Sequence, residues 1–210
     1  MRKITALRIG KGRKRVNIFL EGKFAFSMEA DVVVKENLRV GQELSTSQIE
    51  ALARCNHFHR CLSAAAHYLS YRPRSEFELR QKLKRRSFDN DSVETVIVNL
   101  KEQGLVDDMA FAQFWKDNRE SFSPRSQWLT KLELRQKRVA NDIIDQVVDS
   151  IDDADSAYRA ALSKARSLPL SDYESFRRRL GEYLKRRGFS YPVINQIVKR
   201  IWQEQETGLK

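Results

Sequence analysis

Three copies of one unit recur along the chain, and this internal repeat limits the possible folds more than any other feature of the sequence. Residues 72–100 carry a Pro-Arg-Ser motif at 73–75, a basic stretch, a break at Phe88 and an apolar stretch. A shift of 51 residues places Phe88 on Val139 and the motif on a second Pro-Arg-Ser, and a further shift of 50 residues places Val139 on Phe189. A repeat of this length predicts a row of similar structural units.

The apolar positions within each copy have the spacing of an α-helix. Val93, Val96, Ile97 and Leu100 stand at i, i+3, i+4 and i+7, which is one helical face. The same skeleton recurs as Leu134, Ile144, Val147, Val148 and Ile151, and again as Leu184, Ile194, Ile197, Val198 and Ile201. Two helices cannot bury these stripes alone, so each copy needs a third helix, which we place at 61–69, 109–115 and 157–168. The sequence therefore predicts a mainly α fold with three tandem three-helix repeats, whose stacking would bury a continuous core.

Residues 1–53 have a different pattern, in which apolar residues alternate with others. Val16, Ile18 and Leu20 alternate along one segment, and Glu-Gly at 21–22 is a turn signal before the next. We expect a small three-stranded antiparallel β-meander, with a basic loop at 10–15 and a short helix at 31–38. The expected organisation is an N-terminal segment at 1–53, helical repeats at 54–106, 107–151 and 152–204, and a tail at 205–210.

Polar residues mark where helices begin and end. The tetrapeptide at 47–50 has capping-box spacing, so a long helix is expected to start there. Pro73 is tolerated in the first turn of the next helix, because its missing N–H would have no helical partner. Gly104 suits a left-handed helix end, and one of the two aspartates at 107–108 suits the start of the following helix. These signals close the first repeat and open the second.

Aromatic residues suggest two different roles. Phe111, Phe114 and Trp115 cluster at helical spacing, which favours a core position over a platform for stacking bases. Trp128 falls within the basic helix of the second repeat, where it fits either contact with a partner or packing between repeats.

Composition indicates a folded protein with a polyanionic partner. Of 210 residues, 41% are hydrophobic and 32% charged, and only 4 prolines and 8 glycines are present. The 39 basic and 28 acidic residues give a net charge of +11, which favours a nucleic-acid or nucleoprotein partner. No apolar run approaches the ~18 residues of a membrane span, and with only two cysteines we expect a cytoplasmic location.

The positive charge is concentrated in the middle helix of each repeat. Positions 84, 135 and 185 are equivalent and all basic, as are 86, 137 and 187. We expect a basic stripe that binds a helical polyanion; the alternative is a solvated face that balances six aspartates at 142–155. The candidate partner- or nucleic-acid-binding residues are Arg72, Arg74, Arg80, Lys84, Arg85, Arg86, Arg125, Lys131, Arg135, Lys137, Arg138, Arg178, Arg179, Lys185, Arg186 and Arg187.

Catalytic and metal sites have little support. Cys55, His57, His59 and Cys61 suggest a zinc cluster, but on a helix Cys55 and His59 share one face while His57 and Cys61 share another. Buried cysteines and surface histidines explain the same residues. Phosphate-binding glycine loops and the common hydrolase and metalloprotease motifs are missing from the sequence, so we expect no cofactor and no enzyme activity.

The chain resembles the RecX family of recombinase regulators. The resemblance lies in YLSYRPRSEFELRQKLKRRSF, in LKEQGLVDDMAFAQFW with its downstream Asn118 and Arg119, and in the repeated LxxxLxxxxF skeleton. It covers about 60–204, and the third copy departs from it by carrying Glu174-Ser175 where Arg-Ser is expected.

The resemblance implies that the three-helix repeats form a curved modular array, and that the protein is a regulator of RecA in DNA repair and the SOS response. Members of this family bind RecA, chiefly as its filament on single-stranded DNA, and inhibit its ATPase, strand-exchange and coprotease activities. The implied partners are therefore RecA and its single-stranded DNA filament. Direct contact with single- or double-stranded DNA also remains open. We expect no membrane partner and a monomeric protein. A free-standing DNA-binding protein with helix-turn-helix-like units remains the alternative.

Overall fold

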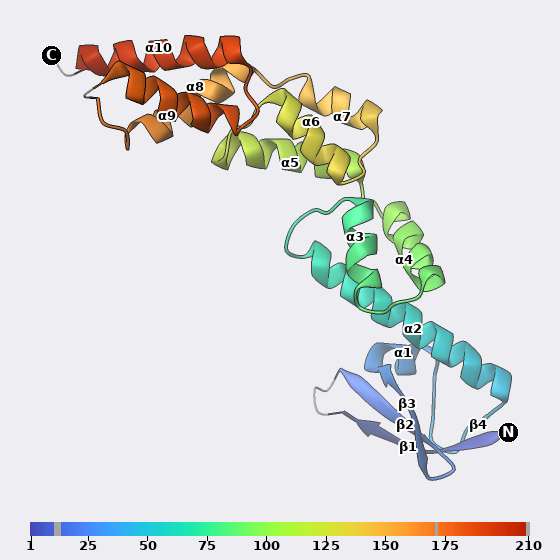
Figure 1. Cartoon of the computed structure of the whole chain (residues 1–210). Coiled ribbons are helices and arrows are strands. Elements are labelled where there is room, and N and C mark those ends of the chain that lie inside the picture. Colours follow the sequence, from blue (N-terminus) through green and yellow to red (C-terminus); the bar gives the residue numbers. More distant parts are fainter. Residues whose placement is uncertain (11–13, 171, 209–210) are drawn as a thin grey trace. The chain divides into compact units, whose positions relative to one another are not determined.

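The computed structural model describes residues 1–10, 14–170 and 172–208, which are mostly helical with a small sheet at the N-terminus (Figure 1). The contacts divide the chain into two compact units. Unit 1 contains Met1–Arg72 and Leu79–Leu105, and unit 2 contains Pro73–Glu78 and Val106–Lys210. Each unit is described by itself below.

The sheet of unit 1 confirms the predicted meander and adds one strand. Strands β1 (Arg2–Ile9), β2 (Arg15–Leu20) and β3 (Lys23–Glu29) are antiparallel neighbours in sequence order. A short strand, β4 (Glu43–Leu44), pairs with the outer edge of β1 and was missed because two residues show no alternation. The predicted basic loop at 10–15 lies partly outside the described residues, which omit 11–13.

One face of the sheet is covered by helices α1 (Ala30–Lys35) and α2 (Thr46–Leu69). Ile4, Ile18 and Met28 are fully buried there, together with Val32 of α1 and Leu52 of α2. A sheet of this size needs such a cover to exclude water from its apolar face. The long helix α2 thus belongs to the N-terminal core at its start, and the boundary expected at residue 53 falls inside it.

The start of α2 is a capping box, two residues earlier than predicted. Ser45 Oγ accepts from the Gln48 N–H at 3.1 Å, and the Gln48 side chain accepts from the Ser45 N–H at 2.8 Å. The assignment to Ser47 was wrong because two serines have capping-box spacing, Ser45 with Gln48 and Ser47 with Glu50, and only the first pair forms the box.

The first three-helix module is formed by the second half of α2 with α3 (Glu76–Lys84) and α4 (Asn90–Glu102). Leu79 and Leu83 of α3 are fully buried, as is Ile97 of α4. The sequence left two roles open for Pro73, the end of one helix or the first turn of the next. Helix α3 begins after Ser75, so Pro73 lies between α2 and α3 and outside the first turn of α3. Gly104 has a φ of +68°, which confirms the expected left-handed helix end.

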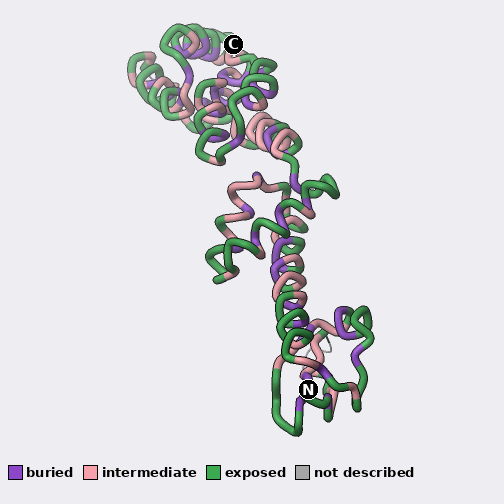
Figure 2. The backbone as a smooth tube through the Cα atoms, turned by 90° about the vertical axis from the view of Figure 1, so that its right-hand side faces the viewer, coloured by how far each residue is buried: buried purple, intermediate pink, exposed green. Residues whose placement is uncertain are grey.

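Unit 2 contains the second and third modules. The second comprises α5 (Asp108–Phe122), α6 (Gln127–Gln136) and α7 (Asn141–Val148), and the third comprises α8 (Asp153–Ala165), α9 (Tyr173–Lys185) and α10 (Tyr191–Gly208). Each has its own core, and Figure 2 shows buried and exposed positions alternating along these helices. Phe111 is fully buried, as expected of a core aromatic residue. Helix α10 continues into the segment expected to be a tail at 205–210.

Candidate partner-binding surface

The Pro-Arg-Ser motif makes a specific set of contacts inside unit 2. Ser75 Oγ accepts from the Glu78 N–H at 3.1 Å, which caps α3, and donates to the Lys137 carbonyl at 3.0 Å. The Glu76 N–H donates to Asp108 Oδ1 at 2.8 Å, and the Lys137 ammonium pairs with the Glu78 carboxylate. The start of α3 is therefore held by groups from the second module.

The same contacts recur between the second and third modules. Ser126 caps α6 and its N–H donates to the Arg187 carbonyl at 3.0 Å. The Gln127 N–H donates to Asp153 Oδ1 at 2.7 Å, and the Arg187 guanidinium donates to Ser123 Oγ at 2.9 Å. We call each set of contacts a joint. The Pro-Arg-Ser motif is thus part of the packing between consecutive modules, which explains why it recurs.

The joints also explain the paired aspartates. Asp107 caps α5, and Asp152 caps α8. The second aspartate of each pair instead accepts from the first turn of the preceding module's middle helix. Each pair therefore caps the start of one helix with its first aspartate and accepts a hydrogen bond from the start of the preceding middle helix with its second. Asp155 pairs with Arg159 at 2.8 Å, so much of the acidic segment at 142–155 is used within the protein.

The third module differs in sequence at the positions where the second module forms its joint. Helix α9 is capped by its own Asp172, whose pKa is lowered by the Ser175 hydrogen bonds. Trp128 and the following leucine of α6, which face Gly188 of the third module, are replaced by Arg178 and Arg179 in α9. Charged residues on this face disfavour the stacking of a further module. Trp128 itself is 64% exposed, although its ring edge reaches the joint.

The two predicted rows of equivalent basic positions have different environments. Lys84 and Lys185 are exposed, and their side chains make no hydrogen bond or ion pair among the described residues. Arg135 is also exposed, and its Nε donates to Asn141 Oδ1 at 3.2 Å. In the other row, Lys137 and Arg187 are half-buried in the joints. Only the row at 84, 135 and 185 faces solvent in all three modules.

Arg125 lies in a half-buried cluster around Glu133. This carboxylate is 11% exposed and accepts from Trp115 Nε1 at 2.8 Å, from Arg119 Nε at 2.8 Å and from the Arg125 guanidinium. Burial lowers the pKa of Arg119, and burial followed by the charges of Arg119 and Arg187 lowers that of Arg125. The cluster binds α5 to α6, so Arg125 is committed to internal packing.

The remaining predicted residues fall into three groups. Arg80 pairs with Glu94, and Lys131 pairs with Asp145 at 2.9 Å, which raises the lysine pKa and lowers the aspartate pKa. The half-buried pair Arg72 and Arg74 also have partners in the protein. Exposed residues are Arg85, Arg86, Arg138, Arg178, Arg179 and Arg186. Of these, Arg86 lies over the Tyr68 ring and Arg138 over the Phe77 ring.

The cysteine and histidine side chains of α2 have different surroundings and do not gather at one place. Cys55 Sγ is 3.7 Å from a Glu36 oxygen, and Cys61 is fully buried, where burial and then Asp89 raise its pKa to about 11. His57 Nε2 is 2.7 Å from Asp89. Within the part of the chain that the structure describes, no three such side chains are placed to hold a metal ion. None of the described helices combines the length and apolarity of a membrane span.

Comparison with known proteins agrees with this architecture. A protein of Clostridium beijerinckii named Regulatory protein RecX is 30% identical over 208 residues, which is 96% of each chain. The chain belongs to the RecX family. A Clostridium botulinum protein of the same name is 31% identical over 95% of this chain and 96% of its own.

Family models and solved structures support the RecX assignment module by module. The model of the Regulatory protein RecX N-terminal domain matches 2–45, and those of the first and third RecX three-helix domains match 61–100 and 151–198. A crystal structure of regulatory protein RecX is 28% identical, with a TM-score of 0.66 over 94% of this chain and 98% of its own. The RecX structure from Lactobacillus salivarius shares the fold, at 22% identity and a TM-score of 0.58 over 70% of this chain and 97% of its own.

The sequence prediction missed one cluster on the third module. Gly181, Tyr191 and Asn195 line a pocket between α9 and α10 together with Arg177, and none was a candidate residue. Alignment of the three repeats could have revealed this cluster. Gly181 and Asn195 stand where the second module carries the charged residues Lys131 and Asp145.

Proposed function

We propose that this RecX-family chain binds RecA, chiefly as its filament on single-stranded DNA, and inhibits the ATPase, strand-exchange and coprotease activities of RecA. A cytoplasmic location and a monomeric state are part of the proposal. The supporting observation is the exposed basic residue that recurs once per module at Lys84, Arg135 and Lys185. A partner that is itself a regular repeat can offer an equivalent acidic group or phosphate to each module.

Electrostatic attraction explains why these positions matter. Each cation that contacts a phosphate releases a counterion, so its removal lowers the salt dependence of binding by about one unit in log–log slope. The net charge of +11 adds long-range attraction to a polyanionic filament. The joint residues are excluded from this role, because their charges are used inside unit 2.

The test is the RecA ATPase on single-stranded DNA, titrated with wild type and with the triple variant Lys84→Ala/Arg135→Ala/Lys185→Ala. We expect substoichiometric inhibition by wild type and a large loss of inhibition in the variant, with a shallower salt dependence. Inhibition by the variant equal to that of wild type would remove these residues from the proposal.

A matched control removes three exposed lysines outside this row. The control variant is Lys23→Ala/Lys35→Ala/Lys199→Ala, which has the same net charge as the test variant. We expect it to inhibit nearly as well as wild type. No inhibition by wild type at excess protein, with tight binding to naked duplex, would favour the free-standing DNA-binding protein. Analytical ultracentrifugation tests the monomeric state.

A further inference from the structure

The three modules differ at one place on the face between their second and third helices. In the first module, Arg80 pairs with Glu94 across this face, and in the second module, Lys131 pairs with Asp145. The equivalent residues of the third module are Gly181 and Asn195, which have no such charges. Each of the two earlier modules therefore has an ion pair between its second and third helices, and the third module has none at this place.

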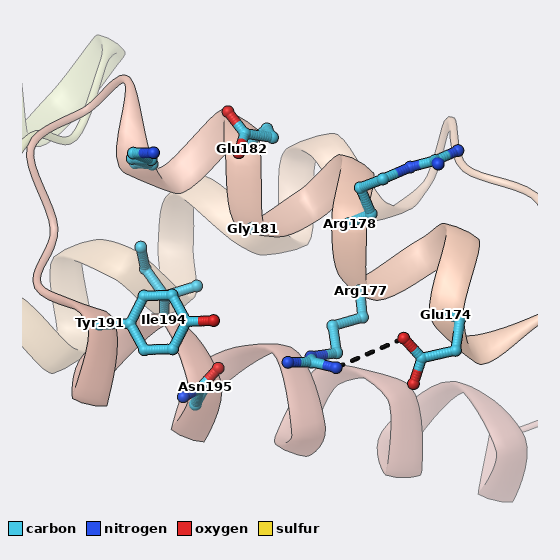
Figure 3. A pocket seen from close by; sticks show the side chains of 9 residues that line it. Glu174, Arg177, Arg178, Gly181, Glu182, Tyr191, Ile194 and Asn195 are labelled. Atoms are coloured by element: carbon cyan, nitrogen blue, oxygen red, sulfur yellow. Dashed lines mark hydrogen bonds and ion pairs between the residues drawn. The ribbon is translucent and has the colours of Figure 1, made fainter.

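The loss of this bridge leaves a pocket of about 340 Å³ between α9 and α10 (Figure 3). A β-carbon placed at Gly181 would lie 3.6 Å from Cγ2 of Ile194, so the helices are in ordinary contact below the opening. Tyr191 and Asn195 project from α10 beside Ile194, as Figure 3 shows. The tyrosine is 68% exposed, which is unusual for so large a ring and leaves its face accessible.

The charges around the pocket are unequal. Arg177 and Glu174 form an ion pair at 3.3 Å and balance each other. The side chains of Arg178 and Lys185 also line the pocket and make no hydrogen bond or ion pair within the described chain, although Arg178 lowers the pKa of nearby Asp172. They stand seven residues apart on α9 with Glu182 between them, and the Arg178 side chain points away from Tyr191 (Figure 3). The lining therefore has one net positive charge, which favours an anionic group beside Lys185, while Tyr191 and Ile194 favour an aromatic or apolar group.

These features match one nucleotide of a single strand. We propose that this pocket receives a nucleotide of single-stranded DNA, with its base against Tyr191 and Ile194 and its phosphate near Lys185. Stacking on an aromatic ring combined with cationic contacts to the backbone is how proteins bind single strands with little sequence preference. The amide of Asn195 is positioned to contact a base edge. The inference rests on the proposed function for the choice of single-stranded DNA.

A charge-neutral substitution can close the pocket. Gly181→Lys with Asn195→Asp recreates the ion pair of the second module and leaves the net charge unchanged. The double variant should melt at or above the temperature of wild type, because glycine is unfavourable inside a helix. Gly181→Ala is the matched control, since it makes the same helix correction without filling the opening.

The measurement is the affinity for a fluorescent oligo(dT) strand, by anisotropy over a range of salt concentrations. We expect the double variant to bind between about fivefold and about a hundredfold more weakly than Gly181→Ala, which is the range for losing one stacked base. The salt slope should fall by no more than about one unit, because at most one phosphate contact is lost with the nucleotide. A strand carrying 5-iododeoxyuridine should crosslink to Tyr191 in the control and not in the double variant.

The outcomes separate this proposal from the proposed function. Equal oligo(dT) binding by the double variant and the control would overturn the pocket, even if wild type inhibits the RecA ATPase. Weaker binding by the double variant would support the pocket, even if wild type fails to inhibit RecA. If closure instead weakens binding of an oligoglutamate peptide and leaves oligo(dT) unaffected, the occupant is an acidic protein segment and the proposal is wrong.

Discussion

Gly188 is the residue on which the joint between the second and third modules depends most directly. Its φ is +84°, and a β-carbon there would lie 2.6 Å from Ser126 Oγ and 2.7 Å from Leu129 Cβ. The equivalent residues of the other modules are Ser87 and Arg138, with φ of +61° and +58°. A left-handed backbone alone therefore does not require glycine here, and the close approach to Ser126 does.

We expect Gly188→Ala to destabilise unit 2 by about 3 kcal/mol. The left-handed conformation costs an alanine about 1 kcal/mol. Displacing Ser126 costs about 1 kcal/mol more, since its hydroxyl caps α6, and forcing the helices apart adds about 1 kcal/mol. At about 4 °C per kcal/mol for a unit of this size, the melting temperature of unit 2 should fall by about 12 °C.

Tryptophan fluorescence during urea unfolding is the appropriate assay, because all three tryptophans lie in unit 2. The control is Gly104→Ala, where φ is +68° and no atom lies within 4 Å of the added carbon. Followed by far-UV circular dichroism, it should cost only the ~1 kcal/mol of the backbone conformation. A loss at Gly188→Ala no larger than that at Gly104→Ala would refute the reasoning.

Three further predictions follow from the same contacts. Lys137→Met should destabilise unit 2 by about 2 kcal/mol in urea unfolding, because it removes the ammonium group that pairs with the largely buried Glu78 carboxylate. Lys185→Met should change the stability by less than about 0.5 kcal/mol. Glu133→Gln should destabilise unit 2 by about 3 kcal/mol, because the half-buried Arg119 and Arg125 guanidinium groups lose their counterion. It should also alter the fluorescence of Trp115, whose indole N–H donates to Glu133. Iodoacetamide should modify Cys55 before Cys61. The rate of Cys61 modification should rise about tenfold per pH unit up to pH 10, whereas the modification rate of an ordinary thiol levels off near pH 8.5. Equal modification rates for the two cysteines would contradict the burial of Cys61.

Periodicity was sufficient to predict the fold because each module is built from local helical stripes. The break residues Phe88, Val139 and Phe189 and the stripes beside them lie where the repeat placed them, and the last two are buried in their module cores. The strand β4 was not predictable in this way, since its two residues are defined by pairing with β1. The start of α2 was misplaced for a related reason, because two serines compete and side-chain geometry selects one.

Separating the two rows of basic residues required the structure. Lys84 and Lys137 both occupy the end of a basic helix, and their side chains are chemically identical. What distinguishes them is Glu78, which lies 59 residues before Lys137 and pairs with it. Sequence patterns report local periodicity and do not show which distant carboxylate lies beside a given lysine.

The ends of the row show how the joints use the repeated residues. The three modules form two joints, in which Lys137 and Arg187 take part. Arg86 is the equivalent residue of the first module. It has no preceding Pro-Arg-Ser segment to contact and is exposed over the Tyr68 ring. At the opposite end, the third module lacks the Pro-Arg-Ser motif and has Arg178 where the second module has Trp128. Both changes fall on residues that form the joint in the second module. The opening at Gly181 is a separate change, because the Lys131–Asp145 ion pair at the equivalent place takes no part in a joint. This independence from module packing is the reason to attribute the pocket to ligand binding.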